Sequence, residues 1–214
     1  MPLLLTKSFF NRDAQKVAKE LLGKVIFVKQ NNIWLKTRII ETEAYYLHDK
    51  ASHASLGYTE KRKALFMPAG TIYMYHSRGG DSLNISCRGQ GNAVLIKSGV
   101  PYLDLEDARE IQEAMLQTMQ KLNPRLNSLL LREPERLCSG QVLLCRSLGL
   151  KIVDWNQKQF DLEKFYFADV GYQVNQVAQT TRLGIAKHRD AALPYRFVDM
   201  NAVKYCTKKP KITL

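Results

Sequence analysis

The chain has 214 residues and a formal net charge of +12, with 32 Lys or Arg against 20 Asp or Glu. This length suits one sizeable core, so we expect residues 1–214 to form a single domain. The basic excess favours a polyanionic partner, either nucleic acid or an acidic surface, although a general solubility effect would also produce it. No segment reaches the roughly 18 apolar residues of a membrane span, and the N-terminus lacks signal-peptide features, so we expect a soluble protein of the cytoplasm or another intracellular compartment.

The cysteines and histidines are not spaced as metal ligands. The chain has four of each, with no Cys-x-x-Cys pair and no His-x-x-x-His set: Cys87, Cys138, Cys145, Cys206, His48, His53, His76 and His188. We therefore predict that the protein has no zinc site and that its cysteines are reduced, buried and inert.

The chain opens with scaffold elements. Residues 11–22 have the pattern of an amphipathic helix that Asn11 or Asp13 can cap. A short strand over 25–28 and a turn at 31–32 then lead into the next strand.

Residues 36–45 are rich in β-branched side chains and favour an extended strand. Alternation along this strand predicts that one face carries Ile39, Glu41, Glu43 and Tyr45. Acids in such a position are usually solvated or paired with Arg or Lys. The pattern alone therefore allows either this structural role or a catalytic role for Glu41 and Glu43.

The segments that follow combine polar and aromatic residues. Residues 47–63 are polar and predict a loop that contains His53. Residues 70–75 predict a strand with Thr71, Tyr73 and Tyr75 on one face, a pattern more typical of a core. A turn over 76–81 and a returning strand over 82–87 would complete a hairpin.

The second half contains fewer clear elements. We predict a strand over 93–97, a helix over 104–122 and short helical turns over 134–150. The buried face of the long helix is expected to include Leu105, Ile111, Met115 and Met119. Residues 151–181 give no firm assignment, and the lysine-rich end from Lys204 to Lys211 is expected to be frayed and able to contact phosphates.

Several of these segments together resemble the 3-methyladenine (alkyladenine) DNA glycosylase family. They occur in order as KTRIIETEAY, SHAS, FMPAGTIYMY, LNIS, GNAVLIKSGVP, LCSG, TTRLGIAK and PYRF, and they span most of the chain. The resemblance implies an α+β fold, a single mixed domain whose curved, mainly antiparallel sheet is surrounded by helices and carries a protruding hairpin.

The resemblance also implies a site and a reaction. Glu43 would activate a water that hydrolyses the bond between a damaged purine and its sugar, while Glu41 would be a structural anion. Tyr45, His53 and Tyr75 would hold the flipped base, and Asn84 would reject purines with an extra amino group. It implies a monofunctional enzyme without metal or cofactor, acting on double-stranded DNA with no membrane partner, and we expect a monomer.

The chain departs from the family pattern at the hairpin tip and beside the site. Arg78 stands near the place of the usual intercalating Tyr, and Lys97 stands where an Arg usually orients the water. The segment after Ser139-Gly140 reads Gln141-Val142 where a Pro is common. We expect Lys97 to act with Glu43, and Arg78 and Arg182 to contact DNA. These departures leave an alternative open, a damaged-DNA-binding relative with weak activity or none.

Overall fold

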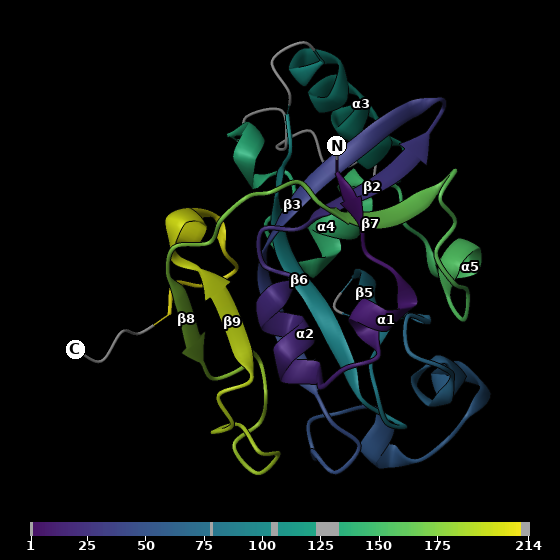
Figure 1. The fold of residues 1–214 in the computed structure, drawn as a ribbon, viewed down its shortest axis with the longest axis vertical. Helices are drawn as coiled ribbons and strands as arrows, with labels where there is room; N and C mark the ends of the chain where they lie inside the picture. Colours follow the sequence, from purple (N-terminus) through teal and green to yellow (C-terminus); the bar gives the residue numbers. More distant parts are fainter. Residues whose placement is uncertain (1, 78, 104–106, 123–132, 211–214) are drawn as a thin grey trace.

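The structure is a computed structural model that describes residues 2–77, 79–103, 107–122 and 133–210. Its framework is one open sheet in which all the described strand pairs are antiparallel, with helices packed around it (Figure 1). The α+β fold class expected from the resemblance is confirmed. Arg78, at the hairpin tip, lies outside the described residues.

The strands follow the order β1-β7-β2-β3-β6-β5-β4, and β9 and β8 extend the sheet from β3. Their bounds are β1 (Leu3–Leu4), β2 (Val25–Gln30), β3 (Ile33–Tyr45), β4 (Ile72–Ser77), β5 (Gly80–Ser86), β6 (Ala93–Pro101), β7 (Phe165–Asp169), β8 (Val177–Thr180) and β9 (Arg196–Asp199).

The helices are short except for one. The α-helices are α1 (Lys7–Phe10), α2 (Ala14–Glu20), α3 (Ala108–Leu122), α4 (Gln141–Ser147) and α5 (Ile152–Trp155). The 3₁₀ helices are η1 (Ala54–Leu56), η2 (Glu60–Phe66), η4 (Pro134–Arg136) and η5 (Met200–Tyr205). None of the helices in the described ranges has the length and apolarity needed to cross a bilayer.

Strand β3 organises the sheet. One of its edges pairs with β2 and then, over residues 41–43, with β9, while its other edge pairs with β6. The β3–β6 register shifts on both sides of Glu41, so that Ile40 on β3 and Lys97 on β6 have no cross-strand partner. These are β-bulges, which turn side chains away from strict alternation. The alternation predicted from Ile39 to Tyr45 is therefore interrupted at residues 39–42.

Helices cover both faces of this central region. The Thr42 hydroxyl donates to the carbonyl of Ala18 on α2 at 2.7 Å. On the opposite face, the ammonium of Lys97 donates to the side-chain oxygen of Gln141 on α4 at 3.2 Å. In Figure 1, α2 accordingly lies in front of β6 and α4 behind the sheet. Glu43 is the next residue after Thr42 on β3, and it belongs to the α4 face because its carboxylate lies 3.6 Å from the ammonium of Lys97.

The hairpin of β4 and β5 is longer than predicted, because pairing continues to Ser77 and Gly80. Gly79 has φ +86°, a conformation that glycine adopts without strain. Gly80 is needed for a different reason, since a Cβ there would lie 2.2 Å from Cγ1 of Val142 on α4. The close approach packs the end of the hairpin that is next to its turn against α4.

Other boundaries also differ from the predictions. The helix expected over 11–22 forms as the shorter α2, and Asp13, one of its two predicted caps, accepts from the backbone N–H groups of Gln15 and Lys16. The preceding α1 is a separate turn that ends at Phe10. The predicted loop over 47–63 contains η1 and the start of η2. Residues 151–181, which had no firm assignment, supply α5, β7 and β8. The predicted burial of Ile111, Met115 and Met119 on α3 is confirmed, whereas Leu105 lies outside the described residues.

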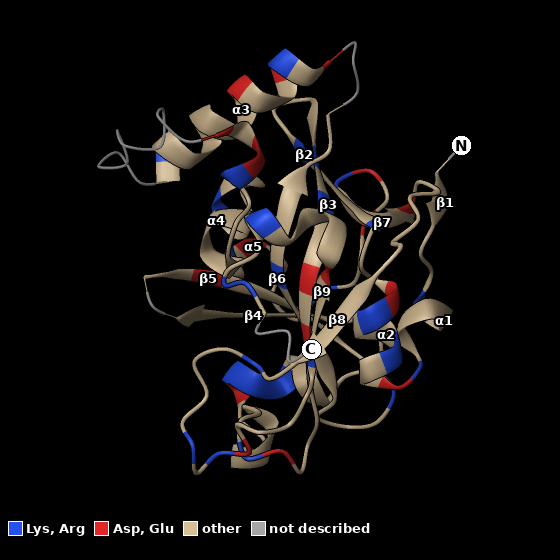
Figure 2. Ribbon diagram, turned by 90° about the vertical axis from the view of Figure 1, so that its left-hand side faces the viewer, with Lys and Arg blue, Asp and Glu red and all other residues tan. Residues whose placement is uncertain are grey.

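All four cysteines are buried, as expected. Burial raises the pKa of the Cys138 thiol to about 11, so this thiol stays protonated and unreactive near neutral pH. Lys and Arg are spread over many elements on the side of the molecule that Figure 2 presents, rather than gathered on one helix.

Candidate active site

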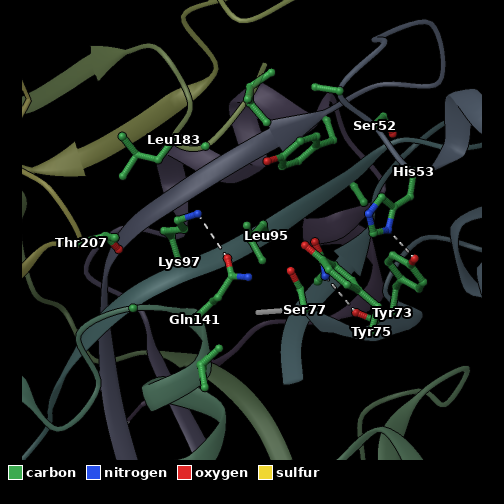
Figure 3. A pocket seen from close by; sticks show the side chains of 18 of the residues that line it. Ser52, His53, Tyr73, Tyr75, Ser77, Leu95, Lys97, Gln141, Leu183 and Thr207 are labelled. Carbon is green, nitrogen blue, oxygen red and sulfur yellow. Dashed lines mark hydrogen bonds between the residues drawn. The ribbon is translucent and has the colours of Figure 1, made fainter. Parts of the chain in front are cut away.

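A cavity of about 490 Å³ opens beside β3, β4 and β6, a size typical of small-ligand sites. Its wall comes from segments far apart in the sequence. His53, Tyr73 and Tyr75 form an aromatic side, and Lys97, Gln141 and Thr207 form a polar side opposite (Figure 3). Tyr45, Asn84 and Leu183 also line it. The structure thus brings together at one cavity most of the residues that the sequence singled out.

The Glu43 carboxylate lies just behind this wall and has no exposed surface. Its Oε2 accepts a hydrogen bond from the Tyr45 hydroxyl at 2.7 Å. Its Oε1 accepts from the backbone N–H of Leu183 at 3.0 Å and lies 3.6 Å from the ammonium of Lys97. Each of these three partners lines the cavity. The carboxylate is therefore held in one orientation by groups that face the ligand space.

Lys97 reaches Glu43 because of the bulge in β6. The same ammonium donates to Gln141 Oε1, and Gln141 Nε2 donates to the Ser82 hydroxyl at 2.8 Å. Gln141 therefore holds the amine as well, and Figure 3 shows its hydrogen bond with Lys97 as a dashed line. Lys97 thus lies beside Glu43, and its other neighbour is Gln141, which the sequence analysis noted as a departure from the family pattern but did not assign to the site.

The aromatic side is held by hydrogen bonds and by ring contacts. His53 Nδ1 and the Tyr73 hydroxyl lie 2.9 Å apart, and the His53 and Tyr75 ring centroids lie 4.4 Å apart in an edge-to-face arrangement. Asn84, which is 5% exposed, donates from its side-chain amide to the Tyr73 carbonyl at 3.2 Å. Tyr73 was assigned to the core. Tyr73 lies two residues before Tyr75 on the same strand, so alternation places both on one face. This spacing could have indicated that Tyr73 also lines the cavity.

Burial is the main cause of a lowered pKa at His53, and the positive charges of Arg62 and Arg189 add to it. The imidazole is thus kept neutral around neutral pH, with one ring nitrogen tied to Tyr73.

Protonation of His53 is expected to destabilise the protein. Because the folded-state pKa lies below the ordinary value of 6.5, the unfolded chain binds the proton more tightly, and the free energy of unfolding falls as the pH drops below about 6.5. Urea unfolding at pH 7.5 and 5.5 should show a smaller loss in His53→Gln than in the wild type. His188→Gln, at an exposed histidine, is the matched control and should behave as the wild type does. Equal losses of unfolding free energy in all three proteins would contradict the lowered pKa of His53.

Arg182 occupies a different place from the one predicted. Its guanidinium pairs with both carboxylate oxygens of Asp49, donates to the Ala44 carbonyl at 3.1 Å and has no exposed side-chain surface. It also lies over the Tyr45 ring, 4.6 Å from the centroid. This burial is at odds with a direct contact between Arg182 and DNA, and instead makes the residue a support for Tyr45.

The second acid of the strand, Glu41, is fully paired. Arg196 Nε donates to its Oε1 at 2.7 Å, while the Ser98 hydroxyl and the Thr207 N–H donate to its Oε2 at 2.8 and 2.7 Å. We call these four residues the Glu41 cluster. Glu41 and Arg196 are both buried, so this acid holds β3, β6, β9 and the C-terminal segment together. The pairing agrees with the structural role expected for Glu41.

The burial of Tyr45 and the charge of Glu43 raise the pKa of the Tyr45 hydroxyl well above its ordinary value. The phenol therefore stays protonated and acts as a hydrogen-bond donor to Glu43. The N–H of Leu183 is the other functional group that the sequence patterns missed, and a backbone donor carries no side-chain signal that could have indicated it.

Comparison with known proteins agrees with this arrangement. The profile of the family described as Methylpurine-DNA glycosylase matches residues 8–202. A relative from Pseudomonas aeruginosa (strain UCBPP-PA14), named "Putative 3-methyladenine DNA glycosylase", is 57% identical over 206 residues, which cover 96% of this chain and 84% of the relative.

Relatives of the same name extend beyond that species. One from Pseudomonas savastanoi pv. phaseolicola is 53% identical over 210 residues, covering 98% of this chain and 92% of its own. One from Koribacter versatilis is 33% identical over 197 residues, covering 91% and 88%. The chain belongs to the methylpurine-DNA glycosylase family. The family resemblance inferred from the sequence motifs is confirmed.

Proposed function

We propose that this DNA glycosylase removes alkylated purines of the 3-methyladenine type, and deaminated purines, from double-stranded DNA by hydrolysis. The observation that carries the proposal is the environment of Glu43. A carboxylate without exposed surface is held by Tyr45, Lys97 and Leu183, and all three line a cavity that also presents His53, Tyr75 and Asn84.

In the proposed reaction, a water oxygen attacks the anomeric carbon of the damaged nucleotide as the bond to the purine breaks. A purine alkylated at N3 or N7 is already cationic and leaves as a neutral base without an acid, whereas a deaminated purine or ethenoadenine is neutral and must take a proton from solvent as it leaves. Glu43 takes the proton of the attacking water, and its charge stabilises the oxocarbenium-like sugar. A carboxylate offers about four acceptor positions, so the two hydrogen bonds to Tyr45 and Leu183 leave acceptor capacity for that water. Because the carboxylate has no exposed surface, the water reaches it when a side chain of the wall, such as Tyr45, shifts as the nucleotide enters. The products are the free base and an abasic site.

The base must leave the duplex to reach this cavity. Tyr45, His53 and Tyr75 would hold it by stacking, and their electron-rich faces favour a cationic purine. The side-chain amide of Asn84 would clash with an additional exocyclic amino group. Arg78, whose structure is not described, is proposed to fill the gap that the flipped base leaves, from its place at the tip of the hairpin.

The surroundings of Lys97 support water, rather than an amine, as the nucleophile. A lysine attacks a sugar carbon only as the free amine. The ammonium of Lys97 instead lies against Glu43 and donates to Gln141. We therefore propose a monofunctional enzyme that acts as a monomer and in which Lys97 orients the water and the carboxylate.

Single-turnover release of base from a duplex with one ethenoadenine or 3-methyladenine-type lesion tests the proposal. We expect the wild-type protein to release the damaged base, to leave unmodified duplex intact and to generate strand breaks only after alkali treatment. Tight binding of the lesion duplex without release would indicate a reader of damage instead. Strand cleavage without alkali would contradict the monofunctional assignment.

A further inference from the structure

The C-terminal segment from Thr207 to Lys209 lies at the rim of the cavity. Thr207 lines the cavity, although it is far in sequence from the strands that form most of the wall. Figure 3 shows it on the polar side, beside Lys97. The segment was expected to be a frayed end, so its contribution to the wall is a finding of the tertiary structure.

The Glu41 cluster fixes this segment. The Ser98 hydroxyl has a single proton, which it donates to Glu41, so the hydroxyl of Thr207, 2.9 Å away, must be the donor to Ser98. The Thr207 N–H also donates to Glu41, and the guanidinium of Arg196 donates to the carbonyl of Lys208. Three hydrogen bonds from two consecutive residues therefore attach the segment to buried groups.

The two lysines of this segment carry charge that the described part of the protein does not neutralise. Lys208 and Lys209 are exposed, and no acid among the described residues forms an ion pair with either. Lys204, a few residues earlier, differs because it pairs with Glu133 at 3.2 Å. Two unpaired cations thus follow directly after a residue of the cavity wall.

We propose that Lys208 and Lys209 are phosphate-binding residues that clamp the DNA backbone next to the flipped nucleotide. The inference rests on the proposed function. Consecutive Cα atoms are about 3.8 Å apart, so both lysines begin within roughly 8 Å of Thr207. A DNA strand carries a phosphate about every 3.4 Å along its axis. A nucleotide that enters the cavity therefore brings its phosphates to the rim where these two cations are held.

The test compares two double variants that remove the same charge. Lys208→Ala/Lys209→Ala alters the rim. Lys16→Ala/Lys19→Ala alters exposed residues of α2, on the opposite face of the sheet, and serves as the matched control. Fluorescence anisotropy with a labelled lesion duplex is measured from 0.05 to about 0.3 M salt.

The plot of log K against log salt has a negative slope, and we expect the rim variant to reduce the magnitude of that slope by about 2. The rim variant should also weaken binding at about 0.1 M salt by up to about 60-fold. The control variant should keep the wild-type slope to within about half a unit. Equal slopes for the two variants, with base release by the wild type, would overturn the clamp but leave the proposed function standing. Failure of the wild type to bind the lesion duplex or to release base from it would overturn both.

Discussion

Glu43→Gln is expected to lower the single-turnover rate of base release by at least about 10²-fold. The change removes the proton acceptor and the negative charge together, and effects of about 10² to 10⁴ are typical for such groups. Because Glu43 has no exposed surface, it cannot itself touch a phosphate, so affinity for the lesion duplex should stay within a few-fold of the wild type.

Two further variants make this expectation specific. Glu110→Gln removes an exposed acid of α3 and should retain the wild-type rate. Glu43→Asp keeps the charge but shortens the side chain, and it should retain more activity than Glu43→Gln. If folded Glu43→Gln released base at the wild-type rate, the catalytic assignment would be wrong.

Glu41→Gln should act on stability instead of chemistry. The change leaves the buried guanidinium of Arg196 without its counter-charge, and breaking a buried pair in this way typically costs about 3 to 5 kcal/mol of unfolding free energy. Urea unfolding measures this loss. The fraction of molecules that remains folded should still release base, because Glu41 is buried and its three hydrogen-bond donors hold it in a structural cluster rather than at the cavity.

The double variant Glu41→Leu/Arg196→Met serves as the control. It removes both charges at similar volume and should lose less stability than Glu41→Gln, because no buried charge remains uncompensated. A stable Glu41→Gln protein that had lost base release would reverse the roles of the two acids.

The sequence by itself determined the elements with strong local signals and several residues that line the cavity. The β-branched run that ends in Glu43 and Tyr45 formed a strand, and the Asn31-Asn32 turn formed with positive φ at both residues. The family motifs indicated His53, Tyr75 and Asn84, and these residues do line one cavity. Such features depend on neighbouring residues or on short motifs, so they can be predicted from the sequence.

Only the tertiary structure decided the arrangement around the two acids. Glu41 and Glu43 are alike in sequence, and they differ because one meets Arg196 from β9 whereas the other meets Lys97 at a bulge. Arg182 was expected from the sequence to contact DNA, but in the structure its guanidinium forms a buried ion pair with Asp49. Pairing partners more than 50 residues apart, a register shift between two strands and a backbone N–H donor are set by the packing of the whole chain. No local pattern encodes them, which is why residues of the cavity wall could be predicted from motifs and the surroundings of the Glu43 carboxylate could not.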